Sequence, residues 1–388
     1  MEYIVVLLIL VIGAFYFDTK KESRQKVLWF VLEWLILVLL AGLRYKVGGD
    51  TIVYQNNYES LYSPWDVFDS QKAADWGILW QLFVALCRFI SKDFTFLQII
   101  HAIVVNTTFL WFFRKKTSRY FLAILIYFVF YYFRFNTETM RSAFAVCCFL
   151  LSYDSLIQKK FLKYYFWVII AIGFHTESVV LLFFPFIHIL EKFKPNPISI
   201  TFLLMLAACS LLFNFLPIIQ NFASSFGDIS EKASSYAARS QLGKGVSVLG
   251  YAHAFLANFT WLYLVILLYK EKHKKNISDI FLQKNLFIGF NIIHFFFGIL
   301  TLNYNNIFYR FQDFTSVITL VALCQVIEIL TIRRYQFQRI LLYSFLVILI
   351  VDRVLYFTSG AIILFYPYSS VFDPVDFPER EWYYNSVQ

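Results

Sequence analysis

Residues 94–119 read FTFLQIIHAIVVNTTFLWFF followed by RKKTSR, an uninterrupted apolar run that ends at a basic cluster. A helix that crosses a bilayer needs about 20 apolar residues, and the run 94–113 has that length. The pattern recurs along the chain, because 60% of its 388 residues are hydrophobic and only 15% are charged. We therefore predict an all-α fold, a polytopic transmembrane helix bundle, in a single integral-membrane domain over residues 1–388.

This composition excludes a soluble enzyme, a disordered chain and a collagen-like fibre. A β-barrel is disfavoured, because the apolar runs are continuous rather than alternating. The five cysteines lie in apolar stretches without a C-x-x-C motif, so we predict no disulfide framework and no metal site. The net charge of +9 comes from short basic clusters between apolar runs, which indicates no nucleic-acid partner.

The apolar runs predict about twelve spans. They lie at residues 3–17, 27–43, 94–113, 119–133, 142–157, 164–174, 177–190, 198–216, 248–269, 281–300, 311–330 and 338–357. The first run lacks a basic n-region and a cleavage site, so we interpret it as a retained helix rather than a signal peptide.

A further apolar stretch, 76–90, is expected to lie in the outer interface without crossing. With it placed there, the loops that hold most of the 34 Lys and Arg all fall on one side. The positive-inside rule makes that side cytoplasmic. Both termini and the larger loops 44–93 and 217–247 are then extracytoplasmic. Many of the cations on the outer side are arginines. Arginine binds phosphate or carboxylate through two hydrogen bonds, so this composition favours an anionic ligand on that side.

The first candidate motif runs from Arg44 through Tyr45-Lys46-Val47-Gly48-Gly49-Asp50 to Tyr54. Its two glycines allow close backbone approach, and Arg44 ends a span where it can face a cavity. The alternative is a snorkelling Arg44 that pairs locally with Asp50.

The pattern R-Y-x-V-G-x-D-x-x-x-Y resembles the EpsG family of bacterial polysaccharide proteins, which are Wzy-type polymerases. The family usually has Thr at the position of Gly49. A second segment, Asn136 to Ala145, is similar to a family helix entry and supplies Arg141, although Ser142 replaces the usual Gln. Arg134 lies seven residues before Arg141, so both share a face if the helix is continuous. The alternative for Glu138 is a surface ion pair with Arg141.

A third segment, Ala171 to Ser178, resembles the family's A-x-x-F-H-x-S element, with Glu177 where Ser is usual. Its His175 is interpreted as functional, against the alternative of a packed core histidine. Arg310 lies in a late R-F element, and Arg239 lies in the large loop 217–247. Four histidines that carry no motif are assigned to packing or to the interface; they are His101, His188, His253 and His294.

The resemblance implies a metal-independent glycosyl transfer with no cofactor, in the bacterial inner membrane and on its extracytoplasmic face. Its substrate would be a polyprenyl-diphosphate-linked oligosaccharide, with membrane lipid, a chain-length regulator and a flippase as partners. Cations would take the charge of the leaving diphosphate, and a base would receive the acceptor proton. His175 is the first choice of base and Asp50 the next, with Glu177 orienting the histidine. The diphosphate ligands would be Arg44, Arg141, Arg310, Tyr54, Arg134 and Arg239.

Three other functions stay open. A glycan–lipid ligase uses the same donor with a different acceptor. A transporter would show paired broken repeats and cations at mid-membrane, whereas these cations lie at the outer ends of spans. A non-catalytic scaffold of a polysaccharide assembly complex is distinguished only by activity.

Overall fold

The computed structural model describes residues 2–61, 67, 76–192, 202, 205–206, 209, 262–263, 284–301, 305–330, 336–358 and 361–387. The chain divides into two compact units, Met1–Pro185 with Ile350–Gln388, and Phe186–Leu349. The first unit contains most of the predicted site residues. The single-domain boundary 1–388 stays a prediction.

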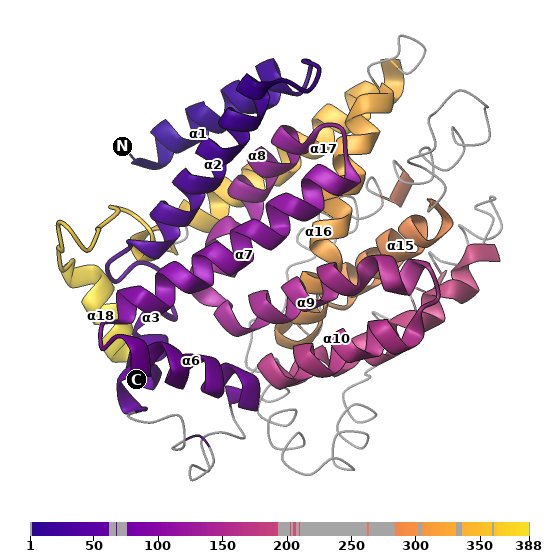
Figure 1. Ribbon diagram of the computed structural model, residues 1–388. Coiled ribbons are helices and arrows are strands. Elements are labelled where there is room, and N and C mark those ends of the chain that lie inside the picture. Colours follow the sequence, from indigo (N-terminus) through magenta and orange to yellow (C-terminus); the bar gives the residue numbers. More distant parts are fainter. Residues whose placement is uncertain are drawn as a thin grey trace. The chain divides into compact units, whose positions relative to one another are not determined.

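The described residues fold as helices, which confirms the all-α class (Figure 1). The α-helices are α1 (Glu2–Ile12), α2 (Arg24–Gly42), α3 (Thr51–Ser60), α6 (Ile78–Ile90), α7 (Phe94–Lys116), α8 (Tyr120–Phe130), α9 (Met140–Ile157), α10 (Phe161–Phe174), α15 (Lys284–Leu300), α16 (Asn305–Leu330), α17 (Gln336–Thr358) and α18 (Pro378–Val387). Between them lie π-helical turns at Gly13–Phe17 and Arg134–Glu138 and 3₁₀ segments at Thr176–Lys192 and Ala361–Leu364.

Four described helices are long and apolar enough to cross a membrane, at Arg24–Gly42, Phe94–Lys116, Met140–Ile157 and Phe308–Glu328. Shorter apolar helices occupy most of the other predicted spans. The runs 198–216 and 248–269 lie largely outside the described residues, so the number of about twelve spans stays a prediction.

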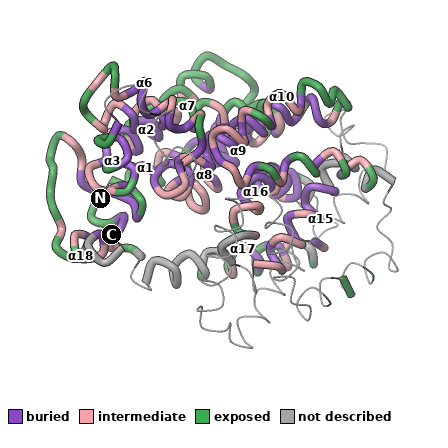
Figure 2. Tube along the Cα trace, turned by 90° about the horizontal axis from the view of Figure 1, so that it is seen from below, coloured by how far each residue is buried: buried purple, intermediate pink, exposed green. Residues whose placement is uncertain are grey.

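Helix α9 is the central helix of the first unit. It packs between α7 and α10, and α7 in turn packs on α2. In the apolar part of α9, 78% of the residues are buried, whereas in the apolar part of α2 the share is 33% (Figure 2). Polar residues at the ends of the runs start these helices: the carboxylate of Asp93 accepts from the amide of Thr95 at 2.9 Å, and Ser23 caps α2 in the same way.

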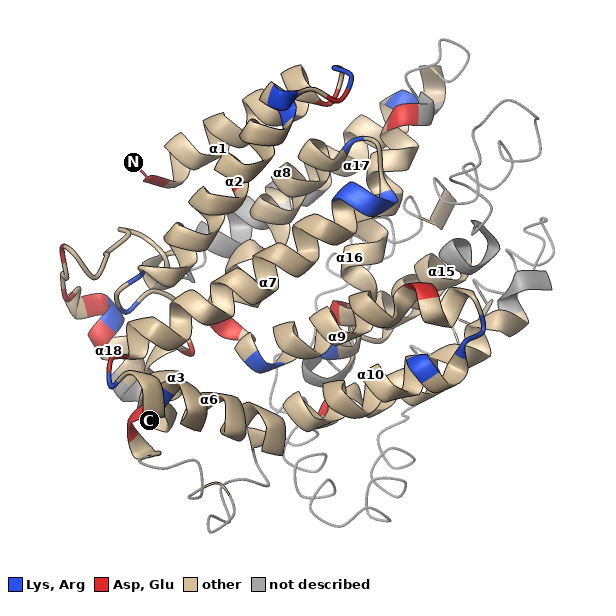
Figure 3. Ribbon diagram, viewed as in Figure 1, with Lys and Arg blue, Asp and Glu red and all other residues tan. Residues whose placement is uncertain are grey.

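The basic loops 18–26 and 114–119 meet at one end of the first unit, near the C-terminal end of α9, and we call this the Lys-rich end. Arg114 pairs with Glu22 at 3.3 Å, and Lys115 pairs with Asp154 at 2.7 Å. Asp18 accepts hydrogen bonds there from the first backbone amides of α8. Most charged residues of the described helices lie at or near helix ends, as the coloured ribbon of Figure 3 shows, because hydrocarbon disfavours charge.

Helix α6 begins and ends at the opposite end, which we call the Arg44 end. Gly77, with φ +86°, starts α6 directly against α10: a Cβ built on it would lie 2.8 Å from the carbonyl oxygen of Phe174. After α6, Ser91 accepts a hydrogen bond from Tyr58 at 2.6 Å, and α7 follows at Phe94. Since α10 ends and α7 starts at this end, α6 does not cross the unit. This agrees with the expectation of a non-spanning helix near 76–90.

A buried polar network joins α7, α8 and the π-helical turn Arg134–Glu138. Asn136 donates to the Tyr127 hydroxyl and to the Tyr132 carbonyl, both at 2.9 Å, and accepts from Asn106 at 2.9 Å. Asn136 and Asn106 are fully buried. Satisfying these polar groups internally fixes the position of the turn, because unpaired amides are costly in an apolar interior.

Asp18 provides a test of this packing through pH. Burial raises the pKa of its carboxyl from an ordinary value of 3.8 to about 6. The folded state therefore binds this proton more tightly than the unfolded state, and stability falls as the pH rises from about 4 to about 6. We expect the thermal midpoint of the wild type to gain more than that of Asp18→Asn when the pH falls from about 7 to about 5. Identical pH dependence in a thermal-shift assay would contradict the burial of Asp18.

Candidate functional site

The loop 44–50 is held by the C-terminal segment 361–387. The buried guanidinium of Arg380 donates to the carbonyls of Ile363 and Lys46 at 2.9 Å and of Pro367 at 2.8 Å. The hydroxyl of Tyr384 donates to the same Lys46 carbonyl at 2.9 Å. Two segments more than three hundred residues apart in sequence are thereby joined at the Arg44 end.

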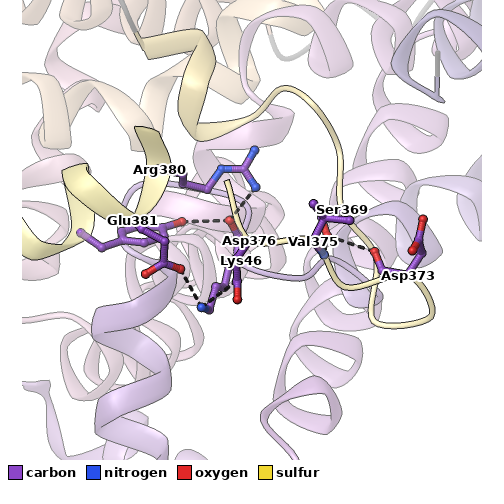
Figure 4. A network of polar contacts seen from close by, with 8 residues as sticks. Lys46, Ser369, Asp373, Val375, Asp376, Arg380 and Glu381 are labelled. Carbon is purple, nitrogen blue, oxygen red and sulfur yellow. Dashed lines mark hydrogen bonds and ion pairs between the residues drawn. The ribbon is translucent and has the colours of Figure 1, made fainter. Parts of the chain in front are cut away.

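An ion-pair network adds to this attachment (Figure 4). The ammonium of Lys46 lies 2.8 Å from Asp376 and 2.7 Å from Glu381. Partial burial opposes its charge, but the two carboxylates prevail and raise the pKa of Lys46 above its ordinary value. The amide of Tyr45 donates to the Ser369 carbonyl at 2.8 Å. The loop 44–50 is therefore fixed by side chains and by backbone.

Arg44 is enclosed by this arrangement, with 1% of its surface exposed. Its guanidinium donates to the carbonyl of Ala41 and lies 3.6 Å from the sulfur of Met140. Burial lowers the pKa of Arg44 to about 10, so it is still charged at neutral pH. The snorkelling alternative does not describe this residue. In this conformation the guanidinium of Arg44 does not reach the surface, and its role as a diphosphate ligand stays a prediction.

His101 on α7 lies near Arg44, although the sequence assigned it to packing or to the interface. It is fully buried, its Nε2 is 3.1 Å from the Met140 carbonyl, and its ring stacks on Phe144 at 5.0 Å. Its Nδ1 has no hydrogen-bond partner among the residues that the structure describes. No motif surrounds His101 in the sequence, so only the three-dimensional arrangement relates it to the site.

A cluster of exposed and buried groups comes from the start of α3, the residue before Gly77, the π-helical turn 134–138 and the start of α9. The hydroxyl of Tyr54 donates to the carbonyl of Glu138 at 3.2 Å, and its ring packs on Trp76 at 5.7 Å. The guanidinium of Arg141 lies over the Trp76 ring at 4.6 Å. Burial raises the pKa of Tyr54, while the nearby Arg141 lowers it and Asp50 raises it further. We call Asp50, Tyr54, Trp76, Glu138 and Arg141 the Tyr54 cluster.

The exposure of the cluster differs from residue to residue. Tyr54 is buried, whereas Asp50 is exposed and Trp76, Glu138 and Arg141 are partly exposed. The structure thus brings together three of the predicted residues, Asp50, Tyr54 and Arg141. Trp76 was missed as an individual residue, because a single aromatic in an apolar stretch carries no signal of its own.

Gly48 explains why the cluster forms at this point. Its φ of +107° is unfavourable for other residues, and a Cβ built on it would lie 2.5 Å from Cβ of Thr137. The loop 44–50 therefore packs directly on the π-helical turn that carries Asn136 and Glu138. At Gly49 the nearest atom to a built Cβ is 3.4 Å away, so a side chain fits there. Of the two positions, only 48 therefore requires glycine for its backbone conformation and packing.

Arg134 and Arg141 do not belong to one continuous helix. The π-helical turn ends at Glu138, Thr139 has non-helical angles of φ −109° and ψ 51°, and α9 starts at Met140. The condition for a shared face, a continuous helix from Arg134 to Arg141, is therefore not met. The role of Arg134 as a diphosphate ligand stays a prediction.

His175 caps the C-terminal end of α10 and is 6% exposed. Its Nε2 lies 3.2 Å from a carboxylate oxygen of Glu177. An ionised carboxylate only accepts, so in a neutral ring paired with ionised Glu177 the proton would lie on Nε2 and the basic lone pair on Nδ1. Gly77 packs on the carbonyl just before His175, and the adjacent Trp76 lies on Arg141. The backbone just before His175 therefore lies next to the segment 76–77, which carries Trp76 of the Tyr54 cluster.

Two further predicted arginines belong to other parts of the chain. Arg310 is partly buried on α16 in the unit Phe186–Leu349, and its role stays a prediction. Arg239 lies outside the described residues. Within the described ranges, no group of three or more His, Cys, Asp or Glu side chains comes together as a metal site would require.

Comparison with known proteins gave one family. The family model, described as the EpsG family, matches residues 26–370. The match includes the loop 44–50, Arg141 and His175, and it ends before α18. Neither the comparison with curated proteins nor that with solved structures gave a match.

Substitution of the two neighbouring glycines tests the packing of the loop. We expect Gly48→Ala to lower the thermal midpoint of the purified protein by several degrees, because the new Cβ meets Thr137 and the backbone is strained. Gly49→Ala is the matched control and should melt close to the wild type. Equal midpoints for the two variants would show that the loop 44–50 does not pack on the turn 134–138.

Proposed function

The chain belongs to the EpsG family, a family of Wzy-type polysaccharide polymerase-like proteins, and we propose that it polymerises lipid-linked oligosaccharide repeat units. One observation carries the proposal. Residues from two of the family-like motifs, Asp50 and Tyr54 from one and Arg141 from the other, meet in a single cluster, and the backbone of the third motif, just before His175, lies next to the segment 76–77.

The charges at this end favour a diphosphate-linked donor. Arg141 is partly exposed, and the buried Arg44 adds a second positive charge behind the surface. Preorganised cations stabilise the negative charge that develops on a departing diphosphate. Such a donor arrives already activated, which suits a chain without a nucleotide-binding motif.

The proposed reaction forms one glycosidic bond and breaks one glycosyl–phosphate bond. The acceptor hydroxyl oxygen attacks the anomeric carbon of the donor, and the bond from that carbon to the polyprenyl diphosphate breaks. The acceptor proton passes to Nδ1 of His175, and Glu177 stabilises the resulting imidazolium. Attack from the side opposite the leaving group inverts the anomeric centre. The diphosphate leaves as an anion facing Arg141.

The distribution of charge supports an extracytoplasmic site in the bacterial inner membrane. In the first unit the Lys-rich end gathers the loops 18–26 and 114–119, whereas the Tyr54 cluster lies at the Arg44 end. The positive-inside rule assigns the Lys-rich end to the cytoplasm. The donor glycan would then be met outside it.

A complementation experiment tests the function. In a strain that lacks this chain, we expect the surface-glycan ladder to be lost while single repeat units persist. Wild type should restore the ladder and Arg141→Ala should not, because the leaving diphosphate loses its partly exposed cation. Arg114→Ala is the matched control, since this exposed arginine lies at the Lys-rich end. An unchanged ladder in the deletion strain, with no second polymerase present, would contradict the proposal.

The base can be tested separately with purified protein and lipid-linked repeat units. We expect His175→Ala to lower the polymerisation rate by about 10²- to 10⁴-fold, because it removes general-base catalysis. Glu177→Gln should lower it by a smaller factor, because the histidine stays in place but loses the carboxylate that stabilises its imidazolium. A greater loss in Glu177→Gln than in His175→Ala would assign the base to Glu177 instead.

A further inference from the structure

Helix α18 lies beyond the residues matched by the family model, yet one of its side chains reaches the candidate site. The hydroxyl of Tyr383 lies 3.6 Å from the position of a Cβ built on Gly49, and its Cε1 lies 3.9 Å from that position. The ring packs against the small apolar core of Val47, Leu364 and Phe365. Tyr383 is therefore fixed in place with its hydroxyl over the loop 44–50.

The neighbouring residues of α18 hold Tyr383 in this position. Arg380 and Tyr384 both donate to the carbonyl of Lys46, and Glu381 pairs with its ammonium at 2.7 Å. Trp382, in contrast, is 70% exposed. Of the residues 380–384, three thus bind Lys46 in the loop 44–50, one side chain points outward, and one faces Gly49.

The surroundings of Tyr383 are acidic. Partial burial, and then Asp50 and Glu138, raise the pKa of its phenol, which therefore stays protonated and can donate a hydrogen bond. Asp50 and Glu138 both belong to the Tyr54 cluster, whose cation Arg141 lies over Trp76. The cluster thus combines acidic and aromatic groups with a cation.

We propose that Tyr383 is a substrate-binding residue that contacts a sugar of the lipid-linked glycan rather than its diphosphate. The inference rests on the proposed function. Carboxylates repel a diphosphate but accept hydrogen bonds from sugar hydroxyls, and a tyrosine offers both an aromatic face and a hydroxyl to a sugar. Arg141, with Arg44 behind it, faces the anionic part of the same ligand.

Two probes separate the sugar from the diphosphate. One is polyprenyl diphosphate without a glycan, and the other is the same lipid carrying a single repeat unit, extracted from the deletion strain. Their affinities would be measured on purified full-length protein in lipid nanodiscs. We expect Tyr383→Phe to bind the glycan-bearing lipid about 3- to 10-fold more weakly, as loss of one hydrogen bond implies, and to bind the bare lipid like the wild type.

Two further variants serve as controls for the binding measurement. Trp382→Phe, on the same helix but exposed, should change neither affinity, and Arg141→Ala should weaken both. Wild-type affinity of Tyr383→Phe for the glycan-bearing lipid would overturn the inference and leave the proposed function intact. Equal weakening for both probes, with a lowered thermal midpoint, would also overturn it, because Tyr383 would then be structural. Failure of the wild type to bind either probe would overturn the proposed function itself.

Discussion

The three hydrogen bonds from Arg380 to backbone carbonyls are the constraint on which the Arg44 end depends. A buried guanidinium must satisfy its donors, and here it does so with the carbonyls of residues 46, 363 and 367. With the C-terminal segment held in this way, Arg44 is enclosed, and the loop 44–50 contacts the turn 134–138 through Gly48. The position of Tyr54 against Glu138 follows from that contact.

The proposed site contains groups suited to two kinds of recognition. The cations Arg44 and Arg141 provide positive charge of the sort that a diphosphate requires. The carboxylates of Asp50 and Glu138, with the hydroxyl of Tyr383, provide neutral or acidic hydrogen-bonding groups of the sort that sugars require. A lipid-linked glycan contains both chemistries in one molecule. The proposed polymerase activity needs both to be held beside a base, and the backbone just before His175 lies next to the segment 76–77.

The sequence predicts the helices well, because apolar runs bounded by charges leave few alternatives in a membrane. The run 94–113, for example, becomes α7 at Phe94–Lys116. Asp50, Tyr54 and Arg141 were also predicted as candidates, although their meeting was not. The runs 119–133 and 142–157 were predicted as separate spans, but the sequence left open whether residues 134–141 continue a helix; the structure places a break at Thr139. The burial of Arg44 and the approach of Tyr383 depend on contacts with the distant C-terminal segment, which no local pattern reports.

Photo-cross-linking tests the central claim most directly, that the Tyr54 cluster binds the lipid-linked glycan. A polyprenyl-diphosphate glycan with a photoreactive group near the diphosphate would be irradiated with the protein in membranes, and the labelled peptides would be identified by mass spectrometry. The account predicts labelling of peptides that contain Asp50 to Tyr54, Trp76 and Glu138 to Arg141. Labelling confined to the loops 18–26 and 114–119 of the Lys-rich end would contradict it.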